Sequence, residues 1–161
     1  DGDLRPYLQK LTVDSGVEDD VCFTGWVDNP YKYISKSTVF VSTSLSEAFS
    51  MVLVEAMACG CPVISTDCDY GPREVLDNGV YGILTKKMDD AFYNISDPLT
   101  DSEIDLLEKL MLLLSDKELL EHYKYLGFER AKDFDSSIAY NKYSNLIESV
   151  ICSNNRKDNC T

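Results

Sequence analysis

Apolar residues in the first half of the chain form short runs that alternate with segments of helical periodicity. The periodic segments predict helices at 3–14, 31–37, 50–59 and 72–76. The apolar runs between them predict strands at 21–24, 39–43, 62–66 and 81–84. Parallel strands need crossover connections, which helices supply. The pattern therefore predicts an α/β chain with a parallel sheet covered by helices.

Strand signals stop at about residue 88, and the rest of the chain has helical periodicity. Thr100 and Glu103 fit a capping box, in which each side chain binds the backbone amide of the other residue at a helix start. Two further helices are expected at 116–134 and 136–150. We expect 1–150 to form one folded unit and 151–161 to be a disordered polar tail.

Composition and charge exclude several classes of function. Hydrophobic residues make up 44% of the chain and charged residues 27%, which is typical of a globular protein. A formal net charge of −13 repels phosphate backbones, so nucleic acid is not expected as a partner. No apolar run approaches the ~20 residues that span a bilayer, and the first ten residues lack the order of a signal peptide. These features favour a cytoplasmic protein, with peripheral contact at the inner face of the membrane as the alternative.

Six cysteines require a decision between disulfides, a metal site and plain thiols. Their scatter is unlike the spacing of a secreted disulfide scaffold. We expect buried, reduced thiols at the positions inside or beside apolar segments, namely Cys22, Cys59, Cys61 and Cys68. A zinc site is the weaker alternative, because the one histidine, His122, lies far away in a predicted helix.

The richest candidate for chemistry is the loop that follows the predicted strand 39–43. In an open parallel sheet, ligands bind beyond the carboxyl ends of the strands. The loop leads into a helix whose first amides have no intrahelical partner and favour an anion. Glu47 precedes this helix and Glu55 lies inside it, so two carboxylates that can accept hydroxyl hydrogen bonds flank a phosphate site. A sugar nucleotide needs this arrangement; the alternative is that both glutamates are merely solvated.

The string around these two residues is specific. It reads Glu47-Ala-Phe-Ser-Met-Val-Leu-Val-Glu55, followed by Ala-Met-Ala-Cys-Gly-Cys-Pro-Val-Ile. This string closely resembles the signature of retaining GT-B glycosyltransferases of the family-4 (group 1) type. Further matches are the Val-x-Phe-x-Gly at 21–25, the Gly-Pro-Arg-Glu-Val-Leu at 71–76 and the Gly-Ile-Leu at 82–84. The resemblance implies a Rossmann-like doubly wound sheet, the C-terminal half of a GT-B fold, followed by C-terminal helices.

The resemblance also implies a role for each matching residue. Glu47 is expected to be the catalytic residue, binding donor-sugar hydroxyls near the anomeric centre, and Glu55 to hold the ribose hydroxyls. Gly25 and Trp26 are expected near the nucleotide base, the alternative being that Trp26 simply packs. The backbone amides expected to contact the sugar and the diphosphate are those of Phe49, Ser50, Met51 and Val52.

Parts of the family pattern have no counterpart in this sequence. An arginine and a lysine that neutralise the diphosphate, and the N-terminal domain that binds the acceptor, would both precede residue 1. The family's strand order is 3-2-1-4-5-6, so its first two strands would lie between 21–24 and 39–43. We therefore expect a partial donor-binding domain, with little or no transferase activity on its own.

The Asp67-Cys68-Asp69 string imitates the Asp-x-Asp metal site of another glycosyltransferase fold. Because it precedes Gly71-Pro72, a turn is the better interpretation. We accordingly expect no metal and no cofactor.

The functional hypothesis is a retaining glycosyltransferase of cell-surface polysaccharide synthesis. Its donor would be a UDP-, GDP- or ADP-sugar and its acceptor a glycan or a lipid-linked glycan. The alternatives are a non-catalytic, truncated nucleotide-binding domain and a sugar-nucleotide 2-epimerase. The sequence does not distinguish the base, the sugar, the acceptor or the linkage.

Overall fold

The computed structural model describes residues 2–157 and contains a parallel three-stranded sheet with the order β1-β2-β3. The strands are β1 (Phe40–Ser42), β2 (Val63–Thr66) and β3 (Ile83–Thr85). Both pairings are parallel, and Ile64 on β2 lies opposite Val41 on one side and Ile83 on the other. Every residue of β2 is buried, as expected of a central parallel strand. The predicted α/β class and parallel sheet are confirmed.

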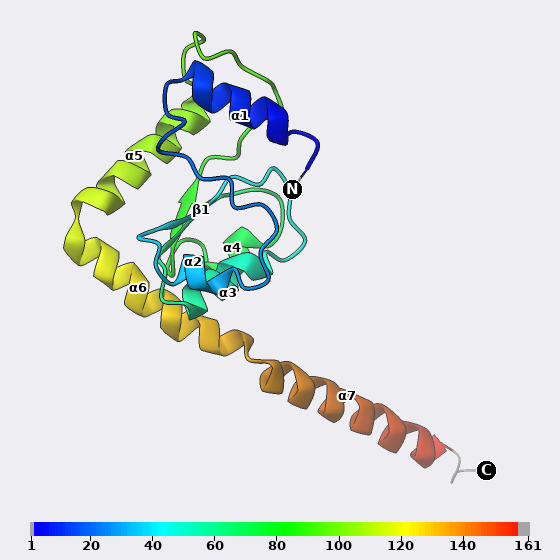
Figure 1. Ribbon diagram of the computed structural model, residues 1–161. Helices are drawn as coiled ribbons and strands as arrows, with labels where there is room; N and C mark the ends of the chain where they lie inside the picture. The colour runs from blue at the N-terminus through cyan, green and yellow to red at the C-terminus, as the bar shows by residue number, and fades with distance from the viewer. Residues whose placement is uncertain (1, 158–161) are drawn as a thin grey trace.

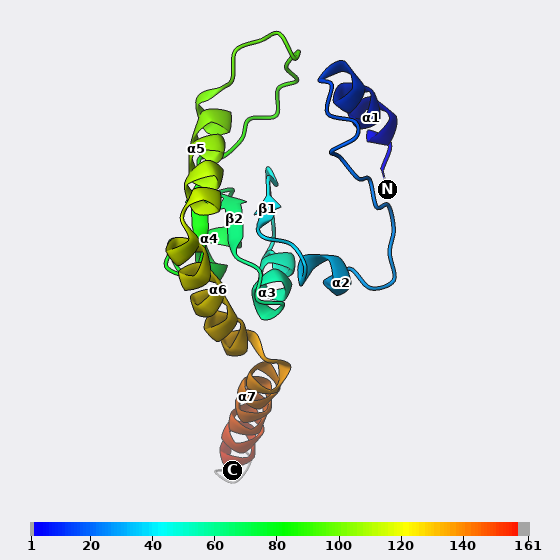
Figure 2. The same ribbon diagram turned by 60° about the vertical axis from the view of Figure 1, so that its left-hand side comes forward.

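The helices occupy the segments that the periodicity predicts (Figures 1 and 2). Those of the first half are α1 (Arg5–Asp14), α2 (Tyr31–Ile34), α3 (Met51–Ala58) and α4 (Pro72–Val75). Those of the second half are α5 (Asp101–Ser115), α6 (Lys117–Ala131), the short 3-10 helix Lys132–Phe134 and α7 (Ser136–Lys157). The capping box at α5 is present: Glu103 N donates to Thr100 Oγ1 at 3.3 Å, and Thr100 N donates to the Glu103 carboxylate at 2.7 Å.

Helices cover both faces of the sheet because successive residues of β2 point to opposite sides. Val63 packs into a core with Leu53 and Met57 of α3, and this core lies between the sheet and α6. Ile64 points to the other face, where it packs with Ile83 and with Leu113 of α5. Two separate apolar cores on a single strand make the sheet doubly wound.

The predicted strand at 21–24 is wrong, because these residues have no strand conformation. Strand hydrogen bonds need a neighbouring strand, and in the described part of the chain β1 pairs with β2 alone. A side chain supplies one hydrogen bond to this segment in place of a neighbouring strand: Arg5 Nη2 donates to the carbonyl of Phe23 at 3.1 Å. Cys22 is exposed as a result, against the expectation of a buried thiol, whereas Cys61 and Cys68 are buried and Cys59 is half-buried.

The predicted polar tail is helical over most of its length. Helix α7 begins at Ser136, as expected, but continues to Lys157 instead of ending at residue 150. Extending a helix adds a hydrogen bond for each residue fixed, and 151–157 contain neither glycine nor proline to stop it. The last part of the predicted tail, 158–161, lies outside the described residues. Figure 1 shows α7 projecting away from the sheet and its covering helices.

Candidate functional site

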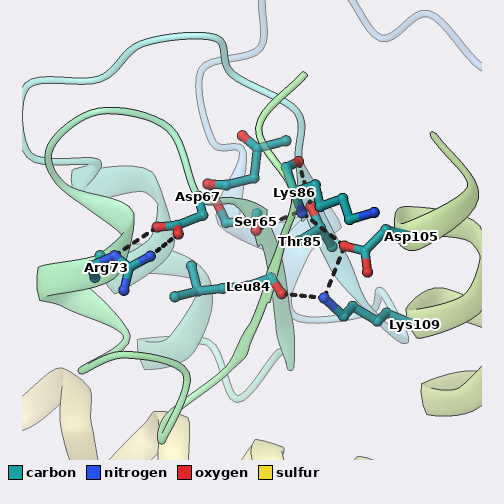
Figure 3. Close-up of polar contacts among 9 residues, drawn as sticks. Ser65, Asp67, Arg73, Leu84, Thr85, Lys86, Asp105 and Lys109 are labelled. Atoms are coloured by element: carbon teal, nitrogen blue, oxygen red, sulfur yellow. Dashed lines mark hydrogen bonds and ion pairs between the residues drawn. The ribbon is translucent and has the colours of Figure 1, made fainter. Parts of the chain in front are cut away.

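The loops that follow the three strands meet at the carboxyl edge of the sheet, where the fold predicts a ligand site. Figure 3 shows this edge at β2 and β3, with Asp67 and Lys86 just beyond the strand ends. Beside it, a cleft of about 880 Å³ extends from Ala48, in the loop after β1, to Arg73 on α4. The first of these loops, 43–50, carries the candidate residues.

The start of α3 is open. Ser50 stands at the N-cap in a left-handed conformation, with φ 62°, and no side chain caps the helix. The amides of Met51 and Val52, the first two helical residues, therefore face outward without an intrahelical acceptor. Ser50 Oγ is buried and makes no hydrogen bond. A buried hydroxyl without a partner is costly, so this position is suited to an incoming hydrogen-bond acceptor.

The two glutamates flank this helix start as the spacing predicts. Glu47 lies in the loop before α3, Glu55 lies within α3, and both side chains are half-buried. Glu47 also lies close to Cys68, beyond β2: burial raises the pKa of the Cys68 thiol, and the charge of Glu47 raises it further. The loops after β1 and β2 thus bring a carboxylate and a neutral thiol together.

Glu55 has a neighbour that the sequence analysis missed. The Glu55 carboxylate lies beside the Tyr31 hydroxyl of α2, where its charge, with a contribution from burial, raises the pKa of the phenol. Helices α2 and α3 are in contact, which brings these two side chains together. The sequence shows Tyr31 only as an aromatic residue at the start of a short predicted helix, and nothing in its local pattern indicates a contact with Glu55.

Three contacts join the loop after β1 to the end of β2 and the loop that follows it. Thr66 Oγ1 donates a 2.6 Å hydrogen bond to the carbonyl of Ser44. Two residues further along, Ser46 forms an isolated parallel bridge with Asp69. Gly71 packs so tightly against Phe49 that an added Cβ would lie 2.8 Å from its carbonyl carbon. The conformation of 44–49 is therefore tied to the end of β2.

The Asp67-Cys68-Asp69 string forms the predicted loop, and cationic side chains bind both carboxylates. Arg73 makes a two-pronged ion pair with Asp67 (Figure 3). Lys87 Nζ lies 2.6 Å from Asp69, and this hydrogen bond raises the pKa of Lys87. Within residues 2–157 no three His, Cys, Asp or Glu side chains cluster as a metal site would require.

A second polar network fixes helix α5 at the end of β3 (Figure 3). Lys109 Nζ donates to the Leu84 carbonyl at 2.8 Å and lies 2.9 Å from Asp105, which also accepts from Lys86 N at 2.8 Å. Partial burial opposes the ionisation of Asp105. The hydrogen bonds from Lys109 and Lys86 outweigh this effect and hold the pKa of Asp105 below its usual range.

Gly25 and Trp26 lie in the segment between α1 and α2, which Figure 2 shows running apart from β1 and α3. Trp26 is 85% exposed. Gly25 borders a separate cleft of about 380 Å³ between this segment and α1. Glu47 and Ser50 thus lie in the loop before α3 and Glu55 lies within that helix, whereas Gly25 and Trp26 belong to the segment between α1 and α2.

The parallel strand order, the crossover helices and the uncapped start of α3 agree with the C-terminal half of a GT-B fold. The chain belongs to the family described as glycosyl transferases group 1, whose model matches residues 1–100. The resemblance drawn from the string at 47–64 is therefore confirmed.

Two curated relatives illustrate this membership. The chain is 35% identical to the uncharacterized glycosyltransferase MJ1059 of Methanocaldococcus jannaschii, over 94% of this chain and 41% of the relative. It is 33% identical to an N-acetylgalactosaminyltransferase of Campylobacter jejuni acting on a diphospho-undecaprenol-linked sugar, over 84% of this chain and 33% of the relative. The chain thus spans well under half the length of these relatives.

Solved structures share the fold. The Anabaena protein HepE, crystallised in complex with UDP, superposes with a TM-score of 0.75 at 22% identity, over 91% of this chain and 38% of that one. Sucrose-phosphate synthase from Thermosynechococcus elongatus superposes with a TM-score of 0.75 at 25% identity, over 94% of this chain and 35% of that one.

Proposed function

We propose that this chain is the donor-binding part of a glycosyltransferase that transfers a sugar from a nucleoside diphosphate sugar to an acceptor. The observation that carries the proposal is the open start of α3, flanked by Glu47 before it and Glu55 within it. Backbone amides and the positive end of a helix suit a diphosphate, and carboxylates suit the hydroxyls on either side of it.

Each residue then has a distinct task. The amides of Phe49, Ser50, Met51 and Val52 bind the diphosphate and the adjoining sugar atoms. Ser50 Oγ, buried and without a hydrogen bond, adds a hydroxyl donor at the same point. Glu55 accepts hydrogen bonds from the ribose hydroxyls. Glu47 accepts hydrogen bonds from the donor sugar and orients its anomeric carbon.

The chemical contribution of this half is stabilisation of the leaving group. As the bond between the anomeric carbon and the phosphate oxygen breaks, negative charge grows on the diphosphate, and amides already aimed at it lower the barrier. We propose that the reaction proceeds with retention, needs no metal ion, and uses a UDP-, GDP- or ADP-sugar.

The names of the relatives support an acceptor of glycan or lipid-linked type. One relative is named for a diphospho-undecaprenol acceptor and another, from Bacillus subtilis, as a poly(glycerol-phosphate) alpha-glucosyltransferase. We propose the same broad class here, in cell-surface polysaccharide synthesis, with the acceptor site on a further domain. Among residues 2–157, no helix is both long and apolar enough to cross a membrane.

Calorimetric titration of UDP, GDP and ADP into the full-length protein tests the proposal. We expect saturable binding of one of the three, weakened about tenfold by Glu55→Gln because the ribose hydroxyls then donate to a neutral amide oxygen instead of a charged carboxylate. Glu108→Gln, an exposed position on α5, is the matched control and should leave binding unchanged. Failure of all three nucleotides to bind the folded protein would reject the proposal.

A further inference from the structure

The turn that carries Glu47 contains a conformation that needs external support. Ser50, at its end, has φ 62°, a left-handed conformation that is unfavourable for a residue with a Cβ atom. Such a conformation persists only where surrounding contacts impose it. The end of β2 and the loop after it supply contacts of this kind.

Thr66, the last residue of β2, provides the first contact. Its side chain is fully buried, and its hydroxyl donates to the Ser44 carbonyl at 2.6 Å, three residues before Glu47. Ser44 lies just beyond the end of β1. The side-chain hydrogen bond from Thr66 therefore links the two strands beyond the last pair of their backbone ladder, Ser42 and Ser65.

Gly71 provides the second contact, on the other side of Glu47. Its φ of 79° and the 2.8 Å separation between a built Cβ and the Phe49 carbonyl carbon both require glycine. The bridge between Ser46 and Asp69 lies between these two contacts. Lys87, beyond β3, binds Asp69 in turn, so the loops after all three strands are linked in series.

We propose that Thr66 and Gly71 are positioning residues that hold the Glu47–Ser50 turn in the conformation that binds the nucleotide sugar. The effect on nucleotide-sugar binding rests on the proposed function. The claim that Thr66 and Gly71 fix the conformation of the turn does not depend on it. Thr66 is fully buried, and Gly71 has no side chain to offer a ligand. Both act by fixing the backbone on which Glu47 and the amides of Phe49 and Ser50 are presented.

Thr66→Val and Thr66→Ser in the full-length protein separate the contribution of the Thr66 hydroxyl from that of the volume of its side chain. Valine keeps the volume and loses the donor, whereas serine keeps the donor and loses a methyl group. We expect Thr66→Val to accelerate amide exchange in 44–50. It should also weaken binding of whichever of UDP, GDP and ADP the wild-type protein binds by about tenfold, the equivalent of one buried hydrogen bond. Thr66→Ser should restore both properties even where its melting temperature is lower.

Thr85→Val is the matched control, since Thr85 is also a buried threonine at a strand end, but its hydroxyl donates to the carbonyls of Ser65 and Lys86, which lie outside the turn. It should leave exchange in 44–50 unchanged. Gly71→Ala is a second, independent variant, in which the new Cβ displaces Phe49 and accelerates the same exchange.

The outcomes separate the two ideas. Unchanged amide exchange and unchanged nucleotide binding in Thr66→Val would overturn the positioning role while leaving the proposed function in place. Accelerated amide exchange in Thr66→Val, in a protein whose wild type binds no nucleotide, would overturn the proposed function. It would still support the claim that Thr66 fixes the conformation of the turn. An equal loss of binding in Thr66→Ser and Thr66→Val would also overturn the positioning role, because serine keeps the hydroxyl. The loss would then be caused by altered packing and not by the missing hydrogen bond.

Discussion

The Glu55 carboxylate of α3 lies beside the Tyr31 hydroxyl of α2 and raises the pKa of that phenol. The largest cause is the charge of Glu55, so Glu55→Gln should lower the pKa of Tyr31 toward its ordinary value of 10.0. NMR titration of ring-labelled tyrosine measures this directly. Glu108→Gln should leave the Tyr31 titration unchanged, and an unshifted pKa in Glu55→Gln would contradict the contact.

Neither the Tyr31–Glu55 contact nor the bond from Thr66 to Ser44 could be predicted from sequence. Each joins residues more than twenty positions apart through the docking of one element on another. Helix α3 and strand β2 were predictable because period, length and the glycine at position 60 all agree locally. The capping box at Thr100 was predictable for the same reason, since both partners lie within three residues.

The two wrong predictions, the strand at 21–24 and the end of α7, arose where local composition does not determine the structure. Residues 21–24 have the composition of a strand, but a strand exists only where another strand accepts its hydrogen bonds. The end of α7 was placed too early because polar composition was taken as a sign of disorder, although nothing in 151–157 breaks a helix. For the site, the string at 47–55 located the uncapped start of α3, and the roles given to the individual residues, Trp26 included, stay predictions.

Asp105 should make the stability of the fold depend on pH. Its folded pKa lies below the ordinary 3.8, so its contribution is fully present above pH 3.8 and is lost as the pH falls through the folded pKa. We expect Asp105→Asn to lower the free energy of unfolding by about 1 kcal/mol at neutral pH, because the ion pair and one charge-assisted bond are weakened. Urea unfolding at pH 7 and at acid pH measures the difference, which should shrink below pH 3.8. A difference independent of pH would show that the charge of Asp105 has no part in it.

Gly127 lets α6 approach α3. A Cβ at this position would lie 3.1 Å from Met57 Cγ, in a core where Met57 is 1% exposed. We expect Gly127→Val to lower the free energy of unfolding by about 1–3 kcal/mol through overpacking, measured by urea unfolding. Tyr125→Val, at a 65% exposed position of the same helix, controls for the helix propensity of valine. Equal effects of the two substitutions would contradict close packing as the cause.

The capping box of α5 should contribute measurably to stability. Thr100→Ala removes the hydroxyl that accepts from Glu103 N, and we expect a loss of about 1 kcal/mol in the free energy of unfolding. Thr100→Ser keeps the acceptor and should retain most of that stability. A serine variant as unstable as the alanine variant would assign the loss to the methyl group of Thr100.

Glu47 and Glu55 should be separable by kinetics, because the proposed site assigns one to the donor sugar and the other to the nucleotide. Glu47→Gln removes a charge that acts at the reacting carbon, so the transfer rate in the full-length enzyme should fall about a hundredfold while the affinity for the free nucleotide changes little. Glu55→Gln should do the reverse, weakening the nucleotide and the donor together with a smaller effect on kcat. Initial rates with donor and acceptor, beside calorimetry with the nucleotide alone, measure both quantities. If Glu47→Gln weakened the free nucleotide as strongly as Glu55→Gln, Glu47 would be a nucleotide ligand and its assignment to the sugar would be wrong.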